Sequence, residues 1–180
     1  MALAVARPPR PATAWVRAGL VAAAVLILDQ LSKHLVRNSI VPGEEQRFLP
    51  GVQLVDTRNH GVAFGFLPGH PGLVTAAIGA AVLALLVYFA RNSAKPLIWL
   101  PTGMLIGGAV GNIVDRLRAG SVTDFVKLPL GWPPFNLADA SIVLGVLLLV
   151  LVIEGGAGGP RPPSRGGRVR FIPSQGERRT

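Results

Sequence analysis

The sequence predicts an all-α integral membrane protein with four transmembrane helices and a small extracytoplasmic β-sheet between the first and second helices. Half of the residues are hydrophobic and 15% are charged, whereas soluble domains usually carry about 25% charged residues. Long segments with at most one charged residue recur along the chain, and a spanning helix needs about 20 mostly apolar residues. A Pro-Gly turn between two short runs indicates the sheet.

We expect the helices near residues 15–36, 73–90, 97–114 and 137–153. The first has the least regular pattern, because Asp29 and Lys33 interrupt it. A removable secretion signal is the alternative for this segment, since a basic start and a short apolar run fit one. No clear cleavage motif of small residues follows the run, and three more apolar segments come after it. A retained first helix is therefore favoured.

The third apolar segment carries a stripe of glycines. Gly103, Gly107 and Gly111 recur at every fourth residue, and small residues at this spacing let another helix approach closely. We therefore predict that this face packs against a neighbouring helix and has no catalytic role.

The long connection from residue 37 to residue 72 contains the expected sheet. Two short runs, 47–49 and 52–55, stand on either side of Pro50 and Gly51. This pattern predicts two strands around a turn. We interpret the segment as a small sheet that lies on the membrane surface.

The net charge of +9, from 18 Lys and Arg against 9 Asp and Glu, lies mostly at the two ends of the chain. Residues 1–14 and 156–180 are rich in Arg, Pro or Gly and are interpreted as disordered basic tails. Residues 15–155 then form one membrane domain. The positive-inside rule places both tails in the cytoplasm. No nucleic-acid partner is expected, because the basic residues are not interleaved with aromatic residues on a folded surface.

Several polar residues stand in or beside the membrane segments, where ionisable groups are costly unless paired and so become candidates for function. Asp29 and Lys33 are four residues apart, which predicts an ion pair on one helical face or a support for a neighbouring site. Asn112 and Arg116 share a face at the end of the third helix, whereas Asp115 points elsewhere. Arg116 either answers the helix dipole or holds a substrate carbonyl by forked hydrogen bonds.

Asp124 and Asp139 stand on either side of one outer connection, next to the outer ends of adjacent helices. We therefore expect these two carboxyl groups to face each other. Asn136 offers another interpretation of Asp139, because an N-cap Asn with an acid three residues later is a variant of the capping box. That interpretation does not account for Asp124, which is flanked by Val122, Phe125 and Val126.

Paired carboxyl groups favour hydrolysis. Two acids held close in a poorly solvated site share a proton. The ionised acid can deprotonate a water, and the protonated acid can polarise a scissile carbonyl and then donate to the leaving amine. No cofactor is expected, and no metal, because the sequence has neither cysteine nor a His-Glu-x-x-His motif. A small transporter or proton pathway through the same acids is the alternative, and a non-catalytic assembly factor is a third.

The chain resembles the lipoprotein signal peptidases, also called signal peptidase II, in five blocks that follow the family's order. The blocks are residues 29–33, 59–65, 111–116, 120–125 and 135–139. They keep their positions relative to the four apolar segments, and the resemblance covers residues 15–155. Val62 and Ser121 stand where many members have Ala and His, which affects only local packing or pocket shape.

The resemblance implies a bacterial inner-membrane aspartic endopeptidase that removes the signal peptide of a prolipoprotein just before a cysteine carrying diacylglycerol. By motif, Asp124 and Asp139 are the catalytic pair. The other site residues are Asn59, Asn112, Arg116 and Asn136, which line the site and hold the substrate backbone, and Asp29, Lys33 and Asp115, which support it.

The resemblance also implies that the sheet cradles the substrate and that the site lies near the outer face of the membrane. Diacylglyceryl-prolipoproteins and membrane lipid are the expected partners of a monomer. The basic tails lie outside the family core, and we expect them to be dispensable for catalysis.

Overall fold

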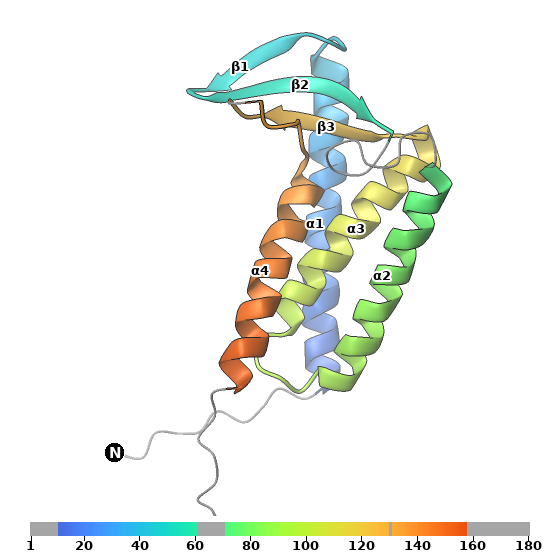
Figure 1. Cartoon of the computed structure of the whole chain (residues 1–180), viewed down its shortest axis with the longest axis vertical. Coiled ribbons are helices and arrows are strands. Elements are labelled where there is room, and N and C mark those ends of the chain that lie inside the picture. Colours follow the sequence, from blue (N-terminus) through green and yellow to red (C-terminus); the bar gives the residue numbers. More distant parts are fainter. Residues whose placement is uncertain (1–10, 61–70, 130, 158–180) are drawn as a thin grey trace, which may run out of the picture.

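The computed structural model describes residues 11–60, 71–129 and 131–157 (Figure 1). In chain order these residues form α1 (Pro11–Ser39), β1 (Glu45–Leu49), β2 (Val52–Asn59), α2 (Pro71–Asn92), α3 (Trp99–Ala119), β3 (Val122–Lys127) and α4 (Leu137–Ala157). Most of each expected tail lies outside the described residues, as does the part of the block at 59–65 that follows His60.

All four expected helices form, and their bounds extend beyond the apolar segments except at the start of α3 and of α4. α1 begins at Pro11 rather than at residue 15, and proline suits the first helical position because its missing N–H would have no partner there. α4 continues to Ala157 rather than ending at 153. The expected bounds followed hydropathy, whereas backbone hydrogen bonding continues into the polar flanks.

The four helices run side by side, and the sheet covers one end of the bundle (Figure 1). The chain enters α1 and leaves α4 at the opposite end. Among the described residues, α1, α2 and α4 are long and apolar enough to cross a membrane. α3 is not one of these, because glycines and a polar last turn reduce its hydropathy. That α3 is a fourth span stays a prediction.

α3 is the central helix and packs against the other three. A Cβ added at Gly103 or Gly107 would lie 2.6 Å from the carbonyl oxygen of Ala18 or Ala22 in α1. The packing role predicted for the glycine stripe is therefore confirmed for these positions. A Cβ added at Gly108, on another face, would lie equally close to the carbonyl oxygen of Ala138 in α4.

The sheet has three antiparallel strands in the order β1-β2-β3. The predicted hairpin forms, with Gly51 at φ +78° in its turn. Placing the whole sheet between the first two helices was wrong, because β3 follows α3. Gly120 ends α3 in the left-handed conformation, and the chain then returns to pair with β2. This pairing joins segments far apart in the sequence, so local pattern gave little sign of it.

The end of the bundle away from the sheet is apolar. Ala14, Ala18, Phe89 and Ile98 form a buried cluster there. We call this end the terminus end, because α1 begins and α4 ends at it (Figure 1). The ring of Trp15 meets that of Phe89 edge to face, with centroids 4.7 Å apart. Packing of apolar surface therefore holds this end together.

Candidate active site

Asp124 lies in β3 opposite Thr57 of β2, and only 3% of it is exposed. Its Oδ2 accepts a hydrogen bond of 2.9 Å from Nδ2 of Asn59, and its Oδ1 accepts one of 2.6 Å from Nδ2 of Asn136. Burial raises the pKa of Asp124 to about 6, although the hydrogen bonds oppose this shift. Asp124 therefore holds a proton more readily than an exposed aspartate.

Asp139 stands in the first turn of α4. Nδ2 of Asn112 donates to its Oδ1 at 2.8 Å, and the backbone N–H of Asn136 donates to its Oδ2 at 3.2 Å. The backbone N–H of Asp139 in turn donates to Oδ1 of Asn136 at 2.9 Å. The capping box considered from the sequence therefore forms, and the same Asn also reaches Asp124.

Asn136 is the residue that brings the two carboxyl groups into one site. It is fully buried, and it contacts Asp124 through its amide nitrogen and Asp139 through its backbone N–H. Its Nδ2 also lies 3.2 Å from Oδ1 of Asn112. Two asparagines thus donate to the two carboxyl groups and contact each other. The charge of Asp139 also helps to raise the pKa of Asp124.

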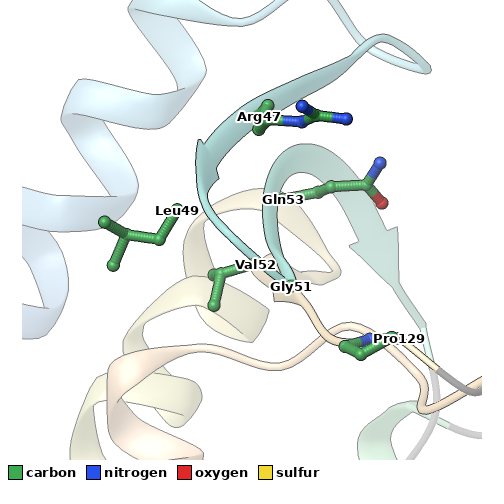
Figure 2. A pocket seen from close by; sticks show the side chains of 6 residues that line it. All are labelled: Arg47, Leu49, Gly51, Val52, Gln53 and Pro129. Atoms are coloured by element: carbon green, nitrogen blue, oxygen red, sulfur yellow. The ribbon is translucent and has the colours of Figure 1, made fainter.

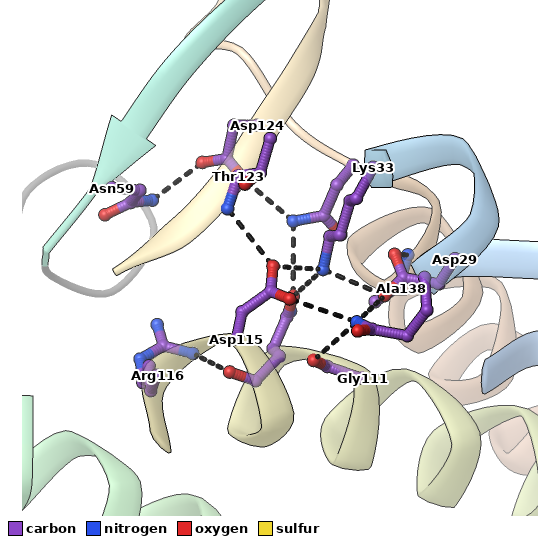
Figure 3. A network of polar contacts seen from close by, with 12 residues as sticks. Asp29, Lys33, Asn59, Gly111, Asp115, Arg116, Thr123, Asp124 and Ala138 are labelled. Atoms are coloured by element: carbon purple, nitrogen blue, oxygen red, sulfur yellow. Dashed lines mark hydrogen bonds and ion pairs between the residues drawn. The ribbon is translucent and has the colours of Figure 1, made fainter. Parts of the chain in front are cut away.

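A buried ionic cluster of Asp29, Lys33 and Asp115 (Figure 3) contacts Asn112 through Lys33. Nζ of Lys33 lies 2.8 Å from Asp29, 3.1 Å from Asp115 and 2.9 Å from Oδ1 of Asn112. Lys33 and Asp29 have no exposed side-chain surface, and Asp115 has 3%. The ion pair predicted between Asp29 and Lys33 is therefore present, and it extends to Asp115 and to the site.

The ionic cluster also holds the two segments that carry the carboxyl groups (Figure 3). Oδ1 of Asp29 accepts the backbone N–H of Ala138, which precedes Asp139, at 2.9 Å. Oδ2 of Asp115 accepts the backbone N–H of Thr123, which precedes Asp124, at 3.2 Å. Asp29 and Asp115 thus each bind the backbone N–H of the residue that precedes Asp139 or Asp124. We call Asp29, Lys33, Asn112, Asp115, Asp124, Asn136 and Asp139 together the carboxylate end.

Arg116 completes the set of site residues expected from the sequence. Its guanidinium donates to the carbonyl oxygen of Asn112 at 3.2 Å, and it interacts electrostatically with Asp124 and Asp139. A guanidinium is the side-chain group best suited to bind a carbonyl or carboxylate by forked hydrogen bonds.

Two sets of polar contacts close to the site, the first made by Gln30 and the second by Thr57, were not predicted from the sequence. Nε2 of Gln30 donates to Oδ1 of Asp115 at 3.0 Å and to the carbonyl oxygen of Gly111 at 3.3 Å. The hydroxyl of Thr57 donates to the carbonyl oxygen of Asp124 at 2.8 Å. The position of Gln30 beside Asp29 was the available signal for the first contact, whereas the second depends on the pairing of β2 with β3.

A separate cavity of about 250 Å³ lies at the hairpin turn of the sheet (Figure 2). Its lining residues are Arg47, Leu49, Gly51, Val52, Gln53 and Pro129. Arg47 and Gln53 are cross-strand partners, and their side chains point to the same side in Figure 2. None of the lining residues belongs to the carboxylate end.

The fold and the site together define a class: a helical membrane protein with two carboxyl groups, those of Asp124 and Asp139, bound by one asparagine at one end of its bundle. Within this class the chain belongs to the signal peptidase II family. The family model described as signal peptidase (SPase) II matches residues 21–154. The resemblance seen in the five blocks is therefore confirmed, and membership makes the chain a bacterial membrane peptidase.

Individual relatives agree with this assignment. The lipoprotein signal peptidase of Syntrophomonas wolfei is 43% identical over 134 residues, which is 73% of this chain and 89% of that protein. The lipoprotein signal peptidase of Serratia proteamaculans is 41% identical over 71% of this chain and 80% of that protein. A solved structure of a bacterial membrane enzyme, determined by the in meso method at 2.3 Å resolution, superposes with a TM-score of 0.75 at 27% identity and covers 80% of this chain and 91% of that one.

Proposed function

We propose that this protein is an aspartic endopeptidase that removes the signal peptide from diacylglyceryl-modified prolipoproteins, cleaving before the lipidated cysteine. Asp124 and Asp139 are the proposed catalytic pair. The observation that carries this proposal is the double contact of Asn136, which hydrogen-bonds both carboxyl groups and so joins two separate elements in one site. The relatives named lipoprotein signal peptidases support the substrate class.

In this mechanism the pair shares one proton. The ionised carboxylate takes a proton from water as its oxygen attacks the scissile carbonyl, and the protonated carboxyl donates to the carbonyl oxygen. On collapse of the tetrahedral intermediate the C–N bond breaks. The carboxyl that took the proton from water gives it to the leaving amine, and the other carboxylate recovers a proton from a hydroxyl of the intermediate. Burial raises the pKa of Asp124 to about 6, which supports retention of a proton at pH values where an exposed aspartate is already ionised.

The neighbouring amides and Arg116 are the proposed substrate-binding groups. Asn59, Asn112 and Asn136 keep the carboxyl groups in place through their Nδ2 atoms, and Arg116 offers donors for the substrate backbone. Asp29, Lys33 and Asp115 support them from behind. The sheet lies over this end of the bundle (Figure 1), where it can cradle the substrate on either side of the scissile bond.

The proposed orientation follows from charge. α1 begins and α4 ends at the end of the bundle opposite the sheet (Figure 1), and the basic residues at the two ends of the chain favour the cytoplasm. The carboxylate end then lies near the outer face of the membrane, with α3 as a fourth span. Water reaches the site from outside, and the lipid and the signal helix of the substrate approach within the bilayer. Because one chain supplies both acids, a monomer suffices.

The test is cleavage of a diacylglyceryl-modified prolipoprotein by Asp124→Asn and Asp139→Asn. We expect each variant to lose at least about 10²–10⁴-fold in turnover, because each removes an acid or base from the reaction. Glu154→Gln, an exposed acid in the last turns of α4, is the matched control and should cleave normally. Near-normal turnover in either aspartate variant would refute the proposed pair.

A further inference from the structure

Thr123 immediately precedes Asp124 in β3 and has no exposed surface. Its Oγ1 accepts two hydrogen bonds from arginines on different elements. NH1 of Arg37, in α1, lies 3.2 Å from this oxygen, and NH1 of Arg58, in β2, lies 3.1 Å from it. A single hydroxyl oxygen therefore joins two guanidinium groups to the strand that carries Asp124.

Like charges so close together repel, and each arginine has a carboxylate that compensates. NH1 of Arg37 lies 3.9 Å from Asp115, and NH2 of Arg58 lies 3.4 Å from Asp56. Asp56 is 4% exposed, and its Oδ1 has no hydrogen-bond partner within the described part of the chain. The guanidinium of Arg58 is thus held by a buried acid of its own strand, and that of Arg37 is held by the ionic cluster. Both arginines are held where they reach Thr123.

The backbone pairing of β3 is irregular beside Asp124. β3 pairs with β2 on one side and with Phe135 on the other, and its pairing with β2 shifts register between Leu54 and Thr57, next to the position of Asp124. Side chains alternate along a strand, so Thr123 is bound on the face opposite to the Asp124 carboxyl. Its backbone N–H donates to Asp115 as well. Contacts to Thr123 therefore restrain the residue before Asp124 from three elements.

We propose that Thr123, held by Arg37 and Arg58, is a positioning residue that sets the place of the Asp124 carboxyl. This inference rests on the proposed function of Asp124. Thr123 touches neither reacting carboxyl in this network, so it acts through the backbone of β3. A displacement of about 1 Å in a catalytic group can cost about 10²-fold in rate. Loss of the Thr123 hydroxyl should therefore produce a measurable fall in turnover.

The experiment compares Thr123→Val, Thr123→Ser and Thr102→Val in the full-length protein, in detergent, with a diacylglyceryl-modified prolipoprotein. Valine keeps the shape of threonine and removes the acceptor, and serine keeps the acceptor. Thr102 is an equally buried threonine in α3 whose hydroxyl bonds the carbonyl oxygen of Ile98 at the terminus end. We expect kcat of Thr123→Val to fall about tenfold or more with KM within about twofold. Thr123→Ser and Thr102→Val should keep kcat within about twofold.

Three results would overturn the inference: normal kcat in Thr123→Val, equal losses in Thr123→Val and Thr123→Ser, or an equal loss in Thr102→Val. Arg58→Lys is the second probe if Thr123→Val does not fold, because it retains a cation beside Asp56 and loses the fork that reaches Thr123. A severalfold drop in its kcat supports the inference, and unchanged kcat overturns it. Asp124→Asn in the same assay separates the two proposals, since activity there would refute the catalytic pair itself.

Discussion

The two ends of this helix bundle are stabilised in opposite ways. The terminus end buries small and aromatic apolar side chains, and its cations stay near the surface over aromatic rings, with Arg17 5.6 Å from the ring centre of Trp99. The carboxylate end buries Lys33 and Asp29 completely and leaves 3% of Asp115 and Asp124 exposed. Hydrogen bonds and ion pairs compensate for that burial.

This difference indicates that apolar packing at the terminus end stabilises the fold, whereas the carboxylate end serves the proposed chemistry. Buried charges cost several kcal/mol each unless their partners are well placed, so the carboxylate end is a costly way to hold a bundle together. Its arrangement suits the role proposed for it, which is to support reacting groups that need fixed positions and a poorly solvated environment. Changes at the terminus end should therefore alter the free energy of unfolding with little effect on turnover, whereas changes at the carboxylate end should alter both.

The largest effect is expected for Lys33→Met. This change leaves Asp29 and Asp115 buried without their cation and removes the donor that orients Asn112. Loss of one partner of a buried ion pair costs about 3–5 kcal/mol, and we expect turnover to fall about 100-fold or more. Thermal unfolding in detergent and prolipoprotein cleavage measure the two effects. Lys95→Met, at the terminus end, is the control, and a Lys33→Met protein that matches it in both assays contradicts the comparison.

Phe89→Ala tests the terminus end. Phe89 is completely buried and meets the ring of Trp15, so its loss leaves a cavity that costs about 3 kcal/mol. We expect a lower unfolding temperature and a kcat within about twofold of the original protein. Leu83→Ala, on a 63% exposed position of the same helix, should change neither. A large fall in kcat for folded Phe89→Ala protein would show that the two ends are not separable.

Gly107→Ala tests the helix contact between the two ends. The added Cβ would lie 2.6 Å from the backbone oxygen of Ala22, so α1 and α3 must separate, at a cost of about 1–3 kcal/mol. Gly79→Ala is the matched control, because no atom lies within 4 Å of its added Cβ and alanine favours the helix by up to about 1 kcal/mol. Unfolding temperatures decide between them, and equal stability of the two variants would contradict close packing along the stripe.

The smallest effect concerns pH. The pKa of Asp124 is raised to about 6 by burial, so the folded protein binds this proton more tightly than the unfolded chain, and stability falls as pH rises through that range. From about pH 4.5 to about pH 7 the loss due to Asp124 is on the order of 1–2 kcal/mol. Unfolding temperatures of the original protein and Asp124→Asn at both values give the difference. If the gap between the two proteins does not change with pH, Asp124 titrates normally.

Much of the helical architecture could be predicted from local pattern. The apolar segments indicated all four helices, and the spacing of Gly103 and Gly107 indicated a close helix contact, because both signals depend on neighbours within a few turns. The pair Asp29 and Lys33 was predictable for the same reason. The extent of the helices was less predictable, since α1 begins at Pro11, in a segment whose composition is typical of a basic tail.

The third strand and the contacts of Thr57 and Thr123 could not be predicted in this way. β3 is short, and its partner β2 lies on the other side of two helices in the sequence. The presence of a threonine in a strand does not indicate whether its hydroxyl will contact an arginine or a carbonyl oxygen. Those contacts depend on the register between distant strands, which the packing of the whole bundle sets.

The sequence by itself determined which charged residues lie in or beside the apolar segments, and these became the candidates for catalysis. Asp124 and Asp139 stood out because charge is expensive among apolar neighbours. Only the tertiary structure decided that Asn136 contacts both carboxyl groups, and that Lys33 lies between Asp29 and Asp115 behind them. The cost of burying each group is a property of its own chemistry, whereas the compensation comes from elements that meet only when the chain folds.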